Sequence, residues 1–115
     1  MTPVEFRRHL HRHPELSFRE TESARFIAEA LREAGIPCRP IAGTGVLAKI
    51  EGRGDLRRAV VLRADIDALP VKEATGLPFA SRNEGRMHAC GHDAHIGQPA
   101  DVQRRNACLL YTSDA

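Results

Sequence analysis

The residues best suited to chemistry in this chain lie in one short run, MHACGHDAH, at residues 87–95. The run combines a thiol, three imidazoles and a carboxylate, separated by small residues. A thiolate and an imidazole together suit zinc or a similar first-row ion, and Cys90 and His92 are close enough to reach one ion from a single turn. A Cys-x-His pair alone is more often a buried thiol beside a surface imidazole, but the additional side chains favour a metal site.

A second polar group follows an apolar segment at residues 59–62. Asp65 and Asp67 stand two residues apart within RADIDALP, at residues 63–70. In an extended chain they would project to the same side, so one carboxylate could reach a metal while the other orients an imidazole. The carboxyl ends of buried strands are also where open α/β sheets place their active sites. An isolated Asp-x-Asp is more often a turn and a helix cap, so this pair alone is weak evidence.

Three further histidines, His9, His11 and His13, alternate along a predicted helix. A spacing of two residues puts successive side chains on different faces of a helix. We therefore expect these imidazoles to be solvated rather than to form a set of ligands.

The composition excludes several classes of protein. The chain has 115 residues, of which 42% are hydrophobic and 28% charged, which is typical of a soluble folded domain and not of a disordered chain. The net charge of +2 and the scattered basic pairs give no nucleic-acid footprint. No apolar run is long enough to span a membrane, and Glu5, Arg7 and Arg8 interrupt the region where a signal peptide needs its apolar core. The three cysteines are an odd number without the spacing of a disulfide framework, which predicts free thiols or a metal ligand in a cytoplasmic protein.

The elements that must position these residues predict an α/β fold. Thr2 and Glu5 form a capping-box pattern before a helix at residues 3–13, and an apolar stripe predicts a second helix at 20–34, ended by Gly35. Strands are predicted at 45–51 and 58–63, paired like a hairpin across a turn at 52–57. The second strand is apolar on both faces, so we expect it to be covered on both sides. Residues 71–86 are predicted to form a loop.

Four segments in this order resemble the amidohydrolase branch of the aminoacylase-type zinc metallopeptidases. They are LHRHPELSF at 10–18, TGV at 44–46, RADIDALP at 63–70 and MHACGHDAH at 87–95. The branch includes hippurate hydrolases, N-acyl-amino-acid deacylases and auxin-conjugate hydrolases. The resemblance implies the N-terminal part of a mixed-sheet, helix-flanked catalytic domain, which is a three-layer α/β/α structure in the intact family. It also implies two divalent ions (zinc, manganese, nickel or cobalt), a small-molecule N-acyl amino acid substrate and a homo-oligomeric parent protein, with no nucleic-acid or membrane partner.

The resemblance assigns roles to individual residues. Cys90 and His92 match the family's metal ligands, and Asp67 matches the catalytic-site aspartate that supports them. Asp65 falls where related branches place a metal-binding histidine. The remaining candidates for orienting the ligands are Asp65, His88, Asp93 and His95. The family's general-base glutamate belongs to a Glu-Glu pair further along, and no glutamate follows Glu84 here.

The resemblance also predicts where the family sequence stops. Residues 1–96 are expected to be the N-terminal portion of the catalytic domain, whereas residues 97–115 match nothing in the family. Pro99 would break the helix that the family continues at this point. We expect the tail to be foreign or translated out of frame. The expected function is metal-dependent hydrolysis of the amide of N-acylated amino acids, by a parent of which this chain is an inactive part. The alternative is a small non-catalytic metal-binding or structural module.

Overall fold

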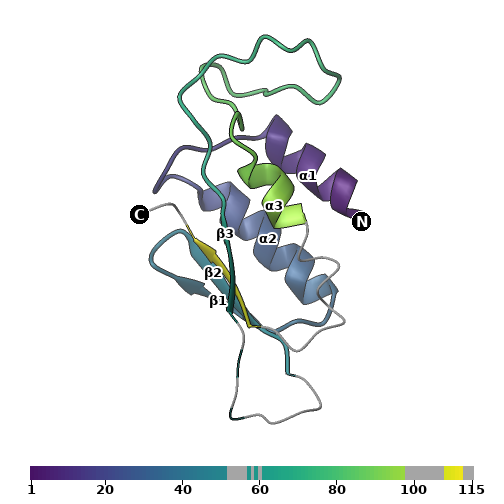
Figure 1. Cartoon of the computed structure of the whole chain (residues 1–115), viewed down its shortest axis with the longest axis vertical. Helices are drawn as coiled ribbons and strands as arrows, with labels where there is room; N and C mark the ends of the chain where they lie inside the picture. Colours follow the sequence, from purple (N-terminus) through teal and green to yellow (C-terminus); the bar gives the residue numbers. More distant parts are fainter. Residues whose placement is uncertain (52–56, 58, 60, 98–107, 113–115) are drawn as a thin grey trace.

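The computed structural model describes residues 1–51, 57, 59, 61–97 and 108–112. Three helices and four strands occur within this part of the chain (Figure 1), which gives the predicted mixed α/β fold. Their order is α1 (Pro3–Arg12), α2 (Thr21–Glu33), β1 (Cys38–Ile41), β2 (Gly45–Lys49), β3 (Val61–Asp65), α3 (His92–Gly97) and β4 (Cys108–Thr112). None of the helices in the described ranges combines the length and apolarity needed to cross a bilayer.

α1 begins at Pro3, where the sequence predicts, and α2 begins at Thr21, one residue after its predicted start. Thr2 and Glu5 form the predicted capping box: the Thr2 hydroxyl accepts the Glu5 N–H, and the Glu5 carboxylate accepts the Thr2 N–H. These hydrogen bonds lower the pKa of Glu5. At α2 the cap comes from the preceding loop, because the carboxylate of Glu15 accepts the backbone N–H groups of Glu22 and Ser23. Both caps satisfy N–H groups that the first turn of a helix leaves without partners.

The strands form one sheet in the order β1-β2-β4-β3. β2 pairs antiparallel with β1 and with β4, and β3 pairs parallel with β4. The predicted hairpin between the strands at 45–51 and 58–63 is therefore wrong, because β4 lies between them. Residues 52–56 of the predicted turn lie outside the described part of the chain, as do residues 58 and 60 of the second predicted strand.

β1 was not predicted, and it contains Pro40, a residue that disfavours strands within a sheet. Proline is tolerated on an edge strand, where its missing N–H removes no bond from the sheet, and β1 is at the edge. The turn that joins β1 to β2 contains Ala42 and Gly43, which both have positive φ angles, of 53° and 82°. Turns of this hand match the twist of an antiparallel hairpin.

One hydrophobic core joins the helices to the sheet. α2 packs on β1 and β2, while α3 packs on β3 and on α1. The side chains of the core come from all three helices, from β2 and from the segments after α2 and β3: Phe6, Leu10, Ile27, Leu31, Ile36, Val46, Ala48, Ile66 and Ile96. The core therefore fixes the helix that carries His92 against the strand that carries Asp65.

Two further predictions concern β3 and the segment after it. Val61 and Leu62 were expected to be covered on both sides, yet 60% and 39% of their surfaces are exposed. β3 is an edge strand of the described sheet, so this expectation is wrong for the chain as it stands. Residues 71–86 form the predicted loop, which projects at the top of Figure 1, and a two-stranded bridge between Leu69 and Met87 closes it.

Candidate metal centre

The end of β3 and the start of α3 meet at the side chain of His92. Its Nδ1 atom lies 2.9 Å from the backbone oxygen of Asp67 and 3.0 Å from Oδ1 of the same residue. Both neighbours of Nδ1 are acceptors, so the hydrogen-bond network assigns the proton of the neutral ring to Nδ1. Nε2 is then the nitrogen that carries a lone pair for a metal ion. A ligating histidine whose other nitrogen donates to a carboxylate or carbonyl is the usual arrangement in metalloproteins.

Asp65 lies on the other side of the same ring. Its Oδ2 atom is 4.0 Å from His92 Nε2, and its Oδ1 atom forms an ion pair of 2.9 Å with Arg63 Nη2. The two aspartates thus both face His92, as the spacing of two residues along an extended chain predicts. Asp67 is buried, whereas Asp65 is half-buried.

Cys90 is a free and exposed thiol two residues before His92. The intervening Gly91 has a φ of 129°, a backbone conformation that residues with side chains rarely adopt, so this turn requires glycine. Within the described residues, no group of three or more His, Cys, Asp or Glu side chains is arranged to hold a metal ion. The donor chemistry of Cys90 and His92 fits a metal, but these residues supply only two of the three or four protein ligands that zinc sites use.

His88 is buried close to this site. Only 4% of its surface is exposed, and neither ring nitrogen has a hydrogen-bond partner in the described part of the chain. Burial lowers the pKa of His88 to about 4 because the charged imidazolium loses its water; the carboxylate of Asp93 opposes this effect, and the nearby His11 and His92 reinforce it. His88 is therefore a neutral imidazole in the native protein at pH 7.

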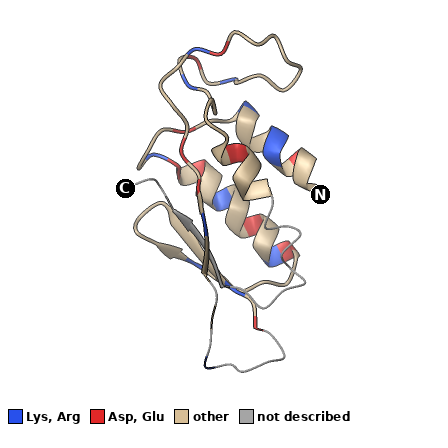
Figure 2. Ribbon diagram, viewed as in Figure 1, with Lys and Arg blue, Asp and Glu red and all other residues tan. Residues whose placement is uncertain are grey.

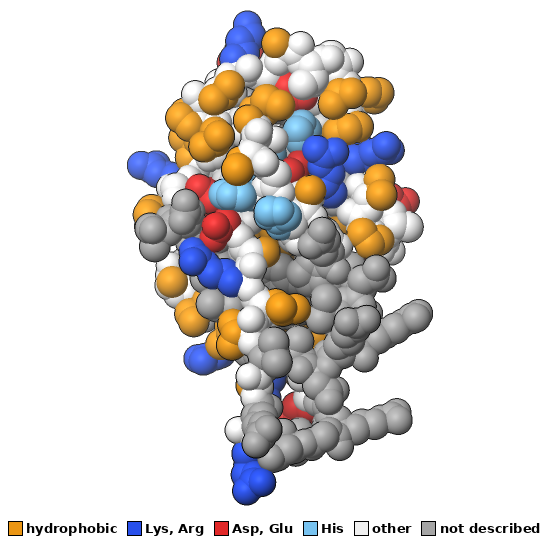
Figure 3. Space-filling view, in the orientation of Figure 1, with side chains coloured by type: hydrophobic (Ala, Val, Ile, Leu, Met, Phe, Trp, Pro, Cys, Tyr) orange, Lys and Arg blue, Asp and Glu red, His pale blue; other side chains and the backbone are white. Residues whose placement is uncertain are grey.

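The other two predicted residues of the cluster, Asp93 and His95, do not share the contacts of His92. Asp93 is fully buried and faces α1, where its Oδ2 atom lies 2.9 Å from Arg7 Nε and 2.7 Å from His11 Nδ1. His95 is exposed on α3 and takes no part in the contacts of His92. Histidine and acidic side chains nevertheless gather on one face of the molecule (Figure 3).

The prediction that His11 is solvated is wrong. Only 2% of its surface is exposed, and its Nε2 atom lies 3.0 Å from Glu73 Oε1. His9 and His13 are half-buried. The spacing of two residues correctly places His11 on a different face from its neighbours, but that face is covered by α3 and by the loop at 71–86, whereas the rings of His9 and His13 lie together with their centroids 4.8 Å apart.

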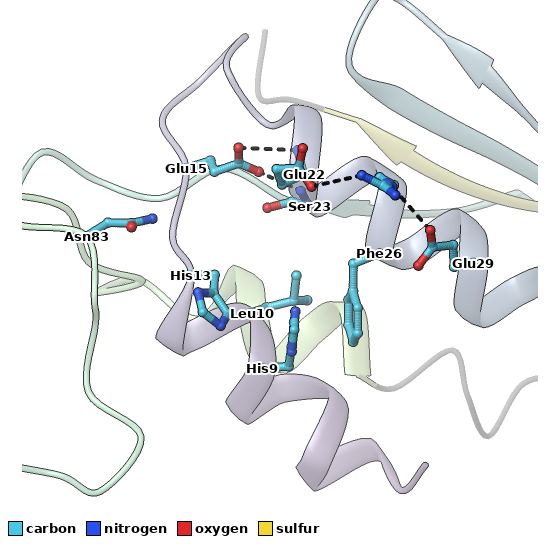
Figure 4. Close-up of a pocket in the computed structure, with 10 residues that line it drawn as sticks. His9, Leu10, His13, Glu15, Glu22, Ser23, Phe26, Glu29 and Asn83 are labelled. Carbon is cyan, nitrogen blue, oxygen red and sulfur yellow. Dashed lines mark hydrogen bonds and ion pairs between the residues drawn. The ribbon is translucent and has the colours of Figure 1, made fainter.

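A separate cavity of about 440 Å³ lies between α1 and α2 (Figure 4). It is lined by His9, His13 and Glu15 on one side and by Phe26 on the other, and it contains none of the predicted site residues. The rings of His9 and Phe26 stack with their centroids 3.8 Å apart. Burial, together with the charges of neighbouring cationic groups, lowers the pKa values of His9 and His13.

An imidazole whose Nδ1 atom lies against the backbone oxygen and the carboxylate of Asp67, two residues after an exposed thiol, has the donor chemistry of a partial metal site. Residues 61–100 match Peptidase family M20/M25/M40. The predicted resemblance to the amidohydrolase branch of the aminoacylase-type metallopeptidases is confirmed, and it covers part of the length of such proteins.

Individual relatives agree with this assignment. The chain is 56% identical over 93 residues to N-acetyl-L-cysteine deacetylase of Bacillus subtilis, an alignment that covers 80% of this chain and 22% of that protein. It is 47% identical over 93 residues to N-acyl-L-amino acid amidohydrolase of Geobacillus stearothermophilus, covering 80% of this chain and 25% of that protein. A Bacillus subtilis crystal structure described as a dinuclear metal-binding peptidase of the M20 family superposes with a TM-score of 0.81 and 43% identity, over 95% of this chain and 33% of that one. The chain thus spans about a quarter to a third of these proteins.

Proposed function

We propose that this chain supplies two metal ligands and their supporting carboxylate to an amidohydrolase that cleaves N-acylated amino acids. The observation that carries the proposal is the contact of His92 Nδ1 with Asp67, since it leaves Nε2 for a metal ion beside the exposed thiol of Cys90. The names of the relatives, a deacetylase of N-acetyl-L-cysteine and an amidohydrolase of N-acyl-L-amino acids, support the substrate class.

The residues of this chain would have distinct tasks in such a centre. Cys90 and His92 would hold metal, and Asp67, whose backbone oxygen and carboxylate lie 2.9 and 3.0 Å from His92 Nδ1, would keep the ring in one orientation and one tautomer. Two divalent ions, when bound, would polarise the amide carbonyl and lower the pKa of the attacking water. Zinc, manganese, nickel and cobalt all remain compatible with a thiolate and an imidazole.

The 115-residue chain by itself is expected to be inactive. Proton transfer from water to the leaving amine needs a general base, and no glutamate follows Glu84 in the sequence. With two ligands from this chain, the affinity for zinc is expected to be weak. The alternative function, a small metal-binding or structural module without catalysis, is favoured by the incomplete set of ligands among the described residues.

A chimera tests the proposal directly. Residues 1–96 would replace the matching segment of Bacillus subtilis N-acetyl-L-cysteine deacetylase, and deacetylation of N-acetyl and N-benzoyl amino acids would be measured with added zinc or manganese. We expect activity in the chimera, and a loss of at least about a hundredfold in kcat/KM in its Cys90→Ser or His92→Ala variant.

Cys38→Ser provides the matched control, because Cys38 is also a free thiol but belongs to β1. The thiol of Cys38 makes only a weak contact with the backbone oxygen of Ala28, so the serine variant is expected to retain activity. A folded chimera without activity, or one in which Cys90→Ser is harmless, would contradict the proposal and favour the non-catalytic module.

Three lesser predictions go with this function. The cytoplasm remains the predicted compartment, supported by the free thiols of Cys38 and Cys90. A homo-oligomeric parent protein remains a prediction from the family. The division of the chain at residues 96 and 97 also stays a prediction; most of the tail lies outside the described residues, and its β4 pairs within the sheet.

A further inference from the structure

Asp93 joins α3 to α1 through a buried set of charges. Its Oδ2 atom accepts hydrogen bonds from Arg7 Nε at 2.9 Å and His11 Nδ1 at 2.7 Å, and its Oδ1 atom accepts the backbone N–H of Ala94 at 2.9 Å. None of the Asp93 side chain is exposed. In Figure 2 the acidic band on α3 lies next to a basic band on α1. A buried carboxylate is tolerated only with such partners, so this contact strongly restricts how α3 can sit.

His11 extends the set of charges to a third segment. Its side chain is 3% exposed, with Asp93 at Nδ1 and Glu73 Oε1 at 3.0 Å from Nε2. Both ring nitrogens face carboxylates, and both can donate only when the ring is the doubly protonated imidazolium. These two contacts of His11 tie α1, α3 and the loop at 71–86 together.

The packing of α3 on α1 is close at its other end as well. A Cβ atom at Gly97 would lie 3.0 Å from the backbone oxygen of Pro3, which is tighter than most real contacts of this kind. α3 has six residues, too few to be stable in isolation, so its orientation depends on what it packs against. The contacts at Asp93 and Gly97 fix α3 on α1 near both of its ends.

His92 directly precedes Asp93 but contacts a different segment, since its ring lies against Asp67 after β3. Any shift or rotation of α3 on α1 would therefore carry the His92 ring away from its acceptors. We propose that Arg7 and His11 are positioning residues, which hold the His92 ring through Asp93. This inference rests on the proposed function for the role of His92 as a ligand, but not for the geometry of its ring.

The experiment measures the His92 ring in the 115-residue chain. Long-range ¹H–¹⁵N NMR spectra of the ¹⁵N-labelled protein distinguish the two tautomers of each imidazole, and a zinc titration measures affinity. We expect a single Nδ1–H tautomer for His92 in the parent chain and a mixture of tautomers in His11→Gln and Arg7→Gln, with zinc affinity lowered roughly tenfold. Arg7→Lys, which keeps the charge, should restore part of the Nδ1–H tautomer of His92 and part of the zinc affinity.

His13→Gln is the matched control, because it removes an imidazole that follows α1 directly but lies outside the contacts of Asp93. His11→Gln removes one partner from each of two buried carboxylates, so circular dichroism must show that it folds. If it does not, Arg7→Gln decides the question, since the Arg7 side chain is 35% exposed and its removal is milder.

The outcomes separate the two proposals. If the folded variants keep the single His92 tautomer and the zinc affinity of His13→Gln, the positioning role is overturned. If the tautomer changes as expected while even the parent chain fails to bind zinc, the positioning role stands and the assignment of His92 as a ligand fails.

Discussion

Two regions of this molecule contain histidines, and they differ in what holds the rings. In the cavity between α1 and α2, His9 stacks on Phe26, and burial lowers the pKa values of His9 and His13. At the end of β3, His92 is held through one named nitrogen by a carboxylate and a carbonyl. The first region is a cavity of about 440 Å³, but its His9 ring packs against Phe26 as an apolar surface. The difference teaches that the orientation of a ring nitrogen, rather than the size of a cavity, distinguishes the proposed ligand from the other histidines.

The largest difference between the two regions should appear on removal of one ring from each. His92→Ala is expected to abolish zinc binding by the chain, because it deletes one of only two proposed ligands, whereas His9→Ala should leave the binding unchanged. Isothermal titration calorimetry on both variants measures this. Zinc affinity that falls more in His9→Ala than in His92→Ala would make the cavity the metal site.

A second difference concerns stability at acid pH, through His88. Its pKa is lowered to about 4 in the folded protein from 6.5, so the unfolded chain binds the proton first as the pH falls. Stability is then full above about pH 6.5 and is lost progressively between pH 6.5 and about 4, by about 3 kcal/mol. Urea unfolding in the presence of EDTA, at several pH values, measures the loss.

The variant His88→Asn should lose less stability than the parent chain between pH 6.5 and about 4. His95→Gln is the control, because His95 is exposed and its removal should leave the slope as it is. An unchanged slope in His88→Asn would assign the acid sensitivity to His9 and His13, in the other region.

A third and smaller effect tests the carboxylate rather than the ring. Asp67→Asn keeps an acceptor for His92 Nδ1 but removes the charge, so zinc affinity should fall about tenfold, as is usual when a ligand loses its supporting carboxylate. Glu29→Gln removes a charge from the cavity instead and should have no effect on zinc. Equal affinities in the two variants would show that Asp67 does not support the ligand.

The smallest effect is expected at the stacked pair in the cavity. Phe26→Ala removes a half-buried ring from His9, which should lower the free energy of unfolding by about 1 kcal/mol and let the pKa of His9 rise toward its ordinary value. NMR titration of His9 measures the second change. Leu77→Ala, at an exposed site in the loop, is the control for loss of apolar surface alone.

The parts of the fold that the sequence predicted depend on local physics. The capping box of α1 involves neighbours on one turn, and the common direction of Asp65 and Asp67 follows from the period of an extended chain. The order of the strands was not predictable in the same way, since the neighbour of β3 is β4, far along the sequence. His11 was missed for a similar reason: its partners, Asp93 and Glu73, come from distant segments whose approach no local spacing indicates.

The exposed side chains of Val61 and Leu62 have a practical consequence for handling the protein. They lie on an edge strand of the described sheet, where unpaired backbone groups accompany apolar side chains. A net charge of +2 offers little electrostatic repulsion between molecules. The solubility of the isolated chain should therefore fall steeply with concentration, and a charged residue at position 61 is the simplest remedy.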